Sequence, residues 1–349
     1  MNMIILKGGT RMSNNANNFV PAANTPDNTD FIDSLNSLSV EDIVPPHKKK
    51  NKKKSFSFFK ISRLLVVFLC IGVFVYCISE LSSIMNDYQR GDNLYGEIEN
   101  GYQSIIEGWT LSNVSAMNIS KSDIPMANYE DVKTNGITIY EPPANSIDRV
   151  TSSPKFRALL SYIENLRDTK NKDMYGYIHI PNTQVQYPMV QTTDNDYYLK
   201  HAFDGDYLAV GSIFIDCRNE KKVEDNKNIV IYGHNMLNGS MFCDATKFLD
   251  ESFFMNPAND IEITTFDGLY TFRVFSAYTT NKYDNYFKTY FPTNDSFLEF
   301  LTEREAKSHF HKEGITFSPD DVIITLSTCI LGDDDGRYAI HAKLIKVER

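Results

Sequence analysis

The longest uninterrupted hydrophobic run in the chain predicts a single transmembrane helix. Residues 64–79 carry no charge and follow Arg63, and apolar side chains on both sides extend the segment to 58–84, which is long enough to cross a bilayer. A buried core helix is the alternative for such a run. The six lysines within residues 48–54 favour the anchor, because basic residues mark its cytoplasmic flank. We expect one uncleaved, single-pass anchor in the cell membrane, with the N-terminus in the cytoplasm and the C-terminal part outside.

The segments on either side of this helix differ in composition. Residues 1–57 are rich in Asn, Ser, Asp, Pro and Lys, which predicts a disordered basic cytoplasmic tail. Residues 85–152 combine helical spacing with several glycines and prolines, so we interpret them as a juxtamembrane stalk or accessory segment. A compact domain is expected over residues 153–349.

The pattern after residue 153 indicates one helix followed mainly by strands. Ser153 can cap a helix whose first residue is Pro154, and its apolar face contains Phe156, Leu159, Leu160, Ile163 and Leu166. Short helices are also expected over residues 241–254 and 295–307, the second capped by Asp295. Strands are predicted at residues 175–180, 185–190, 212–216, 228–232, 260–265, 270–278, 321–328 and 337–347. Eight strands joined by turns predict a mainly β fold, an eight-stranded barrel with peripheral helices.

Charge and cysteine content narrow the possible functions. The net charge of −10 is divided between +5 over residues 1–63 and −15 over the rest, and an acidic domain is not suited to binding nucleic acid. Of five cysteines, Cys70 and Cys77 lie in the apolar run, and no Cys-x-x-Cys spacing occurs. We therefore expect neither a metal nor another cofactor. The three aspartates at residues 333–335 indicate a solvated turn, with calcium binding as the alternative.

Three residues suggest acyl-transfer chemistry. Cys329 ends the β-branched segment Thr-Leu-Ser-Thr-Cys, which is typical of a strand that delivers a thiol to the edge of a sheet. His234 follows a glycine in a Tyr-Gly-His-Asn turn and could carry a proton to a leaving amine. Arg337 follows the cysteine by eight positions and could stabilise an oxyanion with its fixed charge. Each residue alone would more often be structural, but together they predict a cysteine-dependent enzyme.

These motifs, in this order, resemble those of the class B sortases. The resemblance runs from about residue 153 to 347 and includes the Asn-Asp-Tyr-Tyr-Leu stretch at 195–199 and the Gly-Ser-Ile-Phe-Ile-Asp stretch at 211–216. It implies an eight-stranded barrel transpeptidase on the outer face of a Gram-positive membrane. Such an enzyme cleaves a C-terminal sorting signal of a secreted protein and transfers the acyl fragment to an amine of a cell-wall peptide, in lipid II or peptidoglycan. The resemblance assigns the catalytic roles to Cys329, His234 and Arg337.

The same motifs suggest substrate contacts, for which a structural role is an equal alternative. The residues are Asn195, Leu199, Tyr232 and Ser327. Leu199 and Tyr232 could be core residues, and Asn195 could close a turn.

Three other functions are weighed against cell-wall anchoring. A pilin-polymerising sortase would use a lysine amine as the acceptor. A non-catalytic surface module would keep the barrel for binding alone, which the intact set of three residues disfavours. A papain-like or caspase-like hydrolase is disfavoured because the signatures of both are absent, and the order of histidine before cysteine also excludes a papain-like topology.

Overall fold

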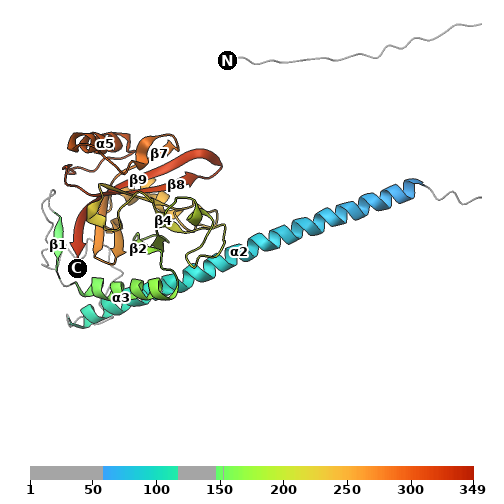
Figure 1. Ribbon diagram of the computed structural model, residues 1–349, viewed down its shortest axis with the longest axis horizontal. Coiled ribbons are helices and arrows are strands. Elements are labelled where there is room, and N and C mark those ends of the chain that lie inside the picture. Colours follow the sequence, from blue (N-terminus) through green and yellow to red (C-terminus); the bar gives the residue numbers. More distant parts are fainter. Residues whose placement is uncertain (1–57, 117–146, 152) are drawn as a thin grey trace, which may run out of the picture. The chain divides into compact units, whose positions relative to one another are not determined.

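The computed structural model describes residues 58–116, 147–151 and 153–349 (Figure 1). They belong to two units, Met1–Leu69 and Cys70–Arg349. The expected tail at residues 1–57 lies outside the described residues, as does most of the second half of the expected stalk.

Helix α2 (Phe58–Ala116) contains the apolar run. Its most apolar stretch has a mean hydropathy of 2.5 and none of it is buried, so the helix is long and apolar enough to cross a membrane. Farther along, Tyr95, Ile98 and Tyr102 are buried in the main hydrophobic core. Part of the segment interpreted as a stalk therefore packs against the barrel, which was not predicted from the sequence.

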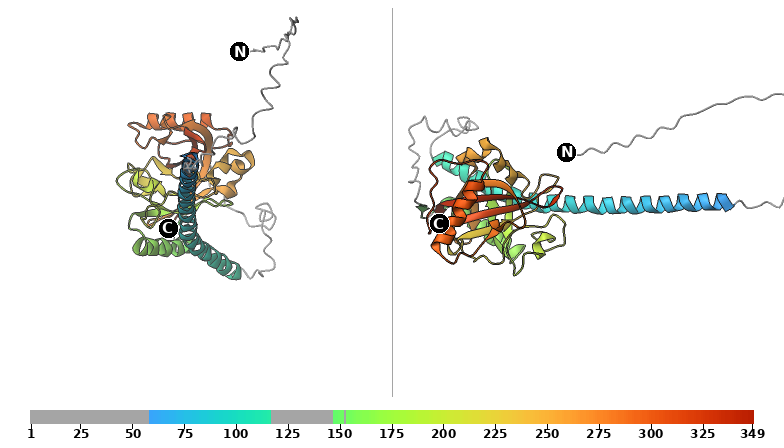
Figure 2. Two further views of the ribbon diagram at one scale, coloured as in Figure 1. Left: turned by 90° about the vertical axis from the view of Figure 1, so that its right-hand side faces the viewer. Right: turned by 90° about the horizontal axis from the view of Figure 1, so that it is seen from above.

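Helix α3 (Pro154–Thr169) begins where the sequence predicts. The Ser153 hydroxyl accepts a hydrogen bond from the Phe156 backbone nitrogen, and the predicted face is buried at Phe156, Leu159, Ile163 and Leu166. In Figures 1 and 2, α3 and α5 (Asn294–Lys307) lie on opposite sides of the strands.

The predicted eight-stranded barrel is confirmed. Its strands are β2 (Met174–His179), β3 (Gln186–Val190), β4 (Ile213–Ile215), β5 (Asn228–Tyr232), β6 (Ile261–Thr265), β7 (Leu269–Asn281), β8 (Ile323–Ile330) and β9 (Asp333–Glu348). They pair in the order β9-β7-β6-β2-β3-β4-β5-β8, and a β8–β9 pairing closes the ring. Strands β3 and β4, like β5 and β8, are parallel neighbours. A ninth strand, β1 (Asp148–Val150), was not predicted and pairs with β9 in parallel.

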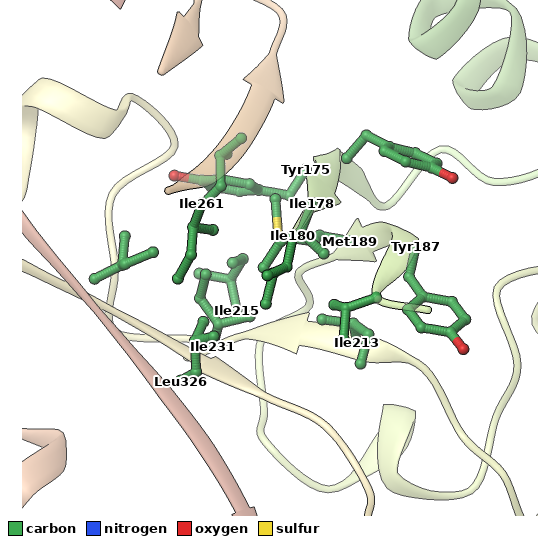
Figure 3. Close-up of a cluster of buried hydrophobic side chains, with 14 of the residues drawn as sticks. Tyr175, Ile178, Ile180, Tyr187, Met189, Ile213, Ile215, Ile231, Ile261 and Leu326 are labelled. Carbon is green, nitrogen blue, oxygen red and sulfur yellow. The ribbon is translucent and has the colours of Figure 1, made fainter. Parts of the chain in front are cut away.

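The core fills the interior of the barrel with side chains from most of its strands (Figure 3). Ile178, Met189, Ile213, Ile231 and Leu326 come from five different strands and are at most 1% exposed. The strand ends that carry the site chemistry are therefore fixed by a continuous apolar core.

The peripheral helices depart from the predictions at their ends. The residues from 241 to 254 contain two short helices, η5 (Asp244–Leu249) and α4 (Glu251–Met255), because Asp250 is extended and caps the second. The predicted cap Asp295 of α5 is wrong. Thr293 caps this helix instead, in a reciprocal capping box with Ser296, and Asp295 lies within its first turn. The described residues contain four further short 3₁₀ helices, η3 (Tyr197–Leu199), η4 (Val223–Asp225), η6 (Pro257–Asn259) and η7 (Asn285–Phe287).

Candidate active site

Strands β5 and β8 bring the histidine turn next to the cysteine strand. Tyr232, the last residue of β5, pairs in register with Ser327, and the Gly233 nitrogen donates to the Ser327 carbonyl at 3.2 Å. The side-chain nitrogen Nδ2 of Asn235 donates to the Cys329 carbonyl at 3.0 Å. These bonds fix the backbone on both sides of His234 relative to the cysteine strand.

Gly233 is required at this turn by close packing. A Cβ atom at this position would lie 2.5 Å from Ile213 Cδ1 and 2.7 Å from Phe242 Cδ2, both from fully buried residues. The backbone at this turn can therefore pack closely against the core only because glycine has no side chain.

Strands β8 and β9 place Arg337 beside the cysteine. Cys329 pairs directly with Arg337 in the antiparallel register. The connection is tighter than expected, since β8 continues to Ile330 and β9 begins at Asp333, leaving Leu331 and Gly332 as the turn, with Gly332 at a φ of 79°. Residues 333–335, interpreted as part of a loop, thus belong to a strand.

All seven predicted site residues line one pocket of about 280 Å³. They are the three proposed catalytic residues and the four proposed substrate contacts, His234, Cys329, Arg337, Asn195, Leu199, Tyr232 and Ser327. Six residues not predicted from the sequence complete the lining, Phe214, Gly233, Lys282, Tyr286, Phe287 and Thr328. The seven residues span more than 140 positions of the chain, and the barrel brings them together.

The imidazole of His234 is oriented by a backbone carbonyl. Its Nε2 lies 2.8 Å from the Leu199 carbonyl oxygen, which can only accept, so Nε2 carries a proton. In the neutral ring, Nδ1 is then the nitrogen without a proton. The Phe242 nitrogen donates to the His234 carbonyl at 2.8 Å and holds the backbone from the other side.

The charge of Arg337 is not neutralised by a carboxylate in the described part of the chain. Its Nη1 donates to the carbonyls of Asp334 at 3.1 Å and Gly336 at 2.7 Å. Asp335 instead pairs with Lys282 at 2.6 Å, and this hydrogen bond raises the pKa of Lys282. The pocket therefore contains a guanidinium whose observed acceptors are neutral.

Tyr232 is held from behind by an ion pair between the buried Asp216 and the half-exposed Arg218. Its hydroxyl donates to Asp216 Oδ2 at 2.8 Å, and Arg218 binds the same carboxylate through two nitrogens at 2.8 and 2.6 Å. Burial alone would raise the pKa of Asp216, but the bonds from Arg218 and Tyr232 lower it below its usual value. Burial and the Asp216 charge raise the pKa of Tyr232, so its hydroxyl stays protonated. The ring is thus a fixed, neutral wall of the pocket.

The other proposed contacts have distinct positions. Leu199 is 37% exposed, so it is not a core residue. The Asn195 side-chain oxygen accepts from the Cys217 backbone nitrogen at 2.8 Å, which ties its loop to the end of β4. Ser327 is buried, and its hydroxyl lies 2.8 Å from the hydroxyl of Tyr286. Burial raises the pKa of Tyr286, and no local sequence motif marked this residue.

Among the described residues, no group of three or more His, Cys, Asp or Glu side chains is placed to hold a metal ion. Asp333 accepts from the backbone nitrogens of Asp335 and Gly336, so it serves the turn. All five cysteines are free, including Cys217 and Cys243.

The barrel brings a cysteine, a histidine and an arginine into one pocket, and comparisons with known proteins define the family. The sortase domain model matches residues 178–345. Sortase B of Listeria monocytogenes is 40% identical over 189 residues, which cover 52% of this chain and 74% of the relative. Sortase B of Staphylococcus aureus is 35% identical over 202 residues, which cover 55% of this chain and 82% of that relative.

A solved structure agrees with these relatives. The X-ray structure of a mutant form of Clostridium perfringens sortase B matches with a TM-score of 0.51 and 34% identity, covering 55% of this chain and 90% of that chain. The chain belongs to the sortase family, as a member of class B. It is therefore a sortase-type cysteine transpeptidase.

Proposed function

We propose that the chain is a membrane-anchored transpeptidase that cleaves a C-terminal sorting signal of secreted proteins and transfers the acyl fragment to a cell-wall peptide amine. The observation that carries the proposal is the single pocket shared by Cys329, His234 and Arg337. In the first half-reaction the Cys329 thiolate attacks the scissile carbonyl carbon. The carbon–nitrogen bond breaks, the leaving amine takes a proton from His234, and a thioester remains.

The second half-reaction reverses the roles of these groups. The acceptor amine attacks the thioester and gives a proton to His234, and the Cys329 thiolate leaves. Because Nε2 donates to the Leu199 carbonyl, Nδ1 is the nitrogen that gains and loses this proton. Arg337 binds the oxyanion in both tetrahedral intermediates.

The pocket wall supplies the proposed recognition of the sorting signal. Leu199 offers an exposed apolar surface, while Tyr232 and Ser327 are fixed by hydrogen bonds behind the pocket. Asn195 lines the same pocket from the loop that carries Leu199. No cofactor takes part in this chemistry.

The thioester can be trapped directly. Full-length protein in detergent is incubated with a library of internally quenched peptides and with triglycine as the amine, and adducts are located by mass spectrometry. We expect an acyl adduct on Cys329 and none in Cys329→Ala. Cys243→Ala is the matched control, because this free thiol lies outside the pocket and burial raises its pKa. Cleavage of no peptide by the wild type would favour a non-catalytic binding module.

The role of Arg337 is tested by a substitution that conserves charge. Arg337→Lys should lower kcat/KM by about 10²-fold or more, since an ammonium cannot reproduce the planar fork at the oxyanion. Steady-state kinetics with the selected peptide measure this loss. A wild-type rate would remove Arg337 from the mechanism.

The proposed localisation is a single-pass protein with its N-terminus in the cytoplasm and its catalytic domain outside. Helix α2 is apolar and long enough for this role, and six lysines precede it at residues 48–54. Protease added to intact cells should digest the catalytic domain and leave an epitope at 48–54 protected. Digestion of that epitope on intact cells would contradict this orientation.

A further inference from the structure

One face of helix α2 forms part of the catalytic domain. Gly91, Tyr95, Ile98 and Tyr102 follow the helical repeat and are all buried. A Cβ atom on Gly91 would lie 3.2 Å from Val210 Cγ1, so the helix backbone closely approaches the loop before β4. This stripe fixes the helix on the loops near the active-site pocket.

The hydroxyl of Tyr95 connects the helix to that loop. It donates to the Gly211 carbonyl at 2.6 Å, accepts from the Phe203 nitrogen at 3.1 Å, and lies 3.3 Å from the Ser212 hydroxyl. Burial raises the pKa of Tyr95, so the hydroxyl keeps its proton and remains a donor. Tyr95 thus fixes three points of one loop.

The Gly211 end of this loop packs directly on the carbonyl that binds His234. Gly211 has a φ of 59°, and a Cβ atom there would lie 2.7 Å from the Tyr198 oxygen and 2.8 Å from the Leu199 oxygen. The next residue, Ser212, donates its backbone hydrogen to the Tyr198 carbonyl at 3.0 Å. The Leu199 oxygen accepts from His234 Nε2 at 2.8 Å. A shift of Gly211 would therefore displace the acceptor that orients the imidazole.

Tyr95 also reaches the other side of His234 through a second tyrosine. Its ring packs edge-on against Tyr187, with centroids 5.5 Å apart. The Tyr187 hydroxyl accepts from the Met241 nitrogen at 2.9 Å, and Met241 forms a bridge with Asn235. The helix is thus linked to His234 by two routes, one through Gly211 and Leu199 and the other through Tyr187 and Met241.

We propose that Tyr95 is a positioning residue for His234, acting through the Gly211 and Leu199 backbone and through Tyr187. It touches no reacting atom. Its effect rests on the proposed function, in which His234 transfers the proton. Tyr95 lies more than fifty positions before the predicted start of the catalytic domain at residue 153.

The test is Tyr95→Phe in the full-length protein, which removes only the hydroxyl. We expect kcat for the fastest-cleaved peptide of the quenched library to fall about tenfold with little change in KM, because a misplaced catalytic group costs rate more than binding. In protein labelled with ¹⁵N-histidine, the NMR chemical shifts of the two ring nitrogens of His234 should move toward the values of a mixture of the two tautomers. A merely structural role would lower the melting temperature without moving those shifts.

Tyr102→Phe is the matched control. Tyr102 lies on the same helix face, and its ring stacks on the ring of Tyr177 with the centroids 4.3 Å apart. Its buried hydroxyl, however, has no hydrogen-bond partner among the described residues. This variant should keep wild-type kcat and wild-type ring shifts. Wild-type kcat and shifts in Tyr95→Phe, or equal losses in the two variants, would overturn the inference. Activity retained in His234→Ala would instead overturn the proposed function, while the ring shifts of Tyr95→Phe would still report on positioning.

Discussion

The ion pair at Glu262 predicts how the stability of the barrel depends on pH. Glu262 of β6 pairs with His179 of β2 at 3.2 Å and with Lys155 of α3 at 2.5 Å, and its side chain is 19% exposed. Burial alone would raise the pKa of this carboxyl. The hydrogen bond from His179 and the charge and hydrogen bond of Lys155 outweigh burial and lower the pKa from 4.5 to about 2.

The magnitude follows from the two pKa values. Each pKa unit corresponds to about 1.4 kcal/mol, so the ionised form of Glu262 stabilises the folded state by at most about 3 kcal/mol. Because the folded pKa is the lower one, this stabilisation is present above pH 4.5 and is lost as the pH falls toward 2. A glutamine at this position resembles the protonated carboxyl at every pH.

Urea unfolding of wild type and Glu262→Gln, followed by near-UV circular dichroism between pH 7 and pH 2, measures this effect. The variant should be less stable by about 2–3 kcal/mol at neutral pH, and the two curves should converge near pH 2. Glu299→Gln is the control, because this exposed glutamate of α5 forms no ion pair with a described residue. A difference that stays constant from pH 7 to pH 2 would refute titration of Glu262 as its source.

Two further substitutions test the packing behind the pocket. Gly233→Ala should lower the free energy of unfolding by about 1–3 kcal/mol and reduce the transfer rate, because the added methyl overlaps two buried side chains. Urea titration measures the change in stability, with Gly96→Ala as the control because a Cβ atom at residue 96 meets nothing within 4 Å. Equal stability of the two variants would contradict the prediction. Asp216→Asn should cost about 1–3 kcal/mol and also slow transfer, since the Arg218 charge loses its carboxylate and Tyr232 its charged acceptor. Unchanged thermal unfolding and rate in Asp216→Asn would show that this ion pair does not fix Tyr232.

The sequence could predict the centre of the pocket because Cys329 and His234 each lie at or just after the end of a recognisable strand. The β-branched run before Cys329 and the apolar run before His234 each mark one strand, and a barrel brings such ends to one rim. The remaining lining depends on contacts between distant segments. Tyr286 enters the pocket from the short helix η7, which follows β7, and only the folded chain places its hydroxyl against Ser327.

Other differences between the predicted and the observed secondary structure arise where tertiary contacts override the local conformational preference of the residues. Aspartate is rare in strands, so the start of β9 was expected at Arg337. The structure begins the strand at Asp333 because Gly332 completes a two-residue turn and the Lys282 nitrogen donates to the Asp335 carbonyl. The buried face of α2 did have a sequence signal, apolar residues at helical spacing, but the interspersed glycines concealed it.

The acidic hairpin beside the cysteine supports the proposed role of Arg337 instead of opposing it. Asp335 is paired with Lys282, and Asp333 is occupied by backbone nitrogens, so neither neutralises the guanidinium. The observed partners of Arg337 are carbonyl oxygens of its own hairpin. Hydrogen bonds to an ionised acceptor are about twice as strong as those to a neutral one. Both carbonyls bind the same nitrogen, Nη1, so an oxyanion formed at Cys329 would find further N–H donors on the guanidinium and would be bound more strongly than a neutral carbonyl.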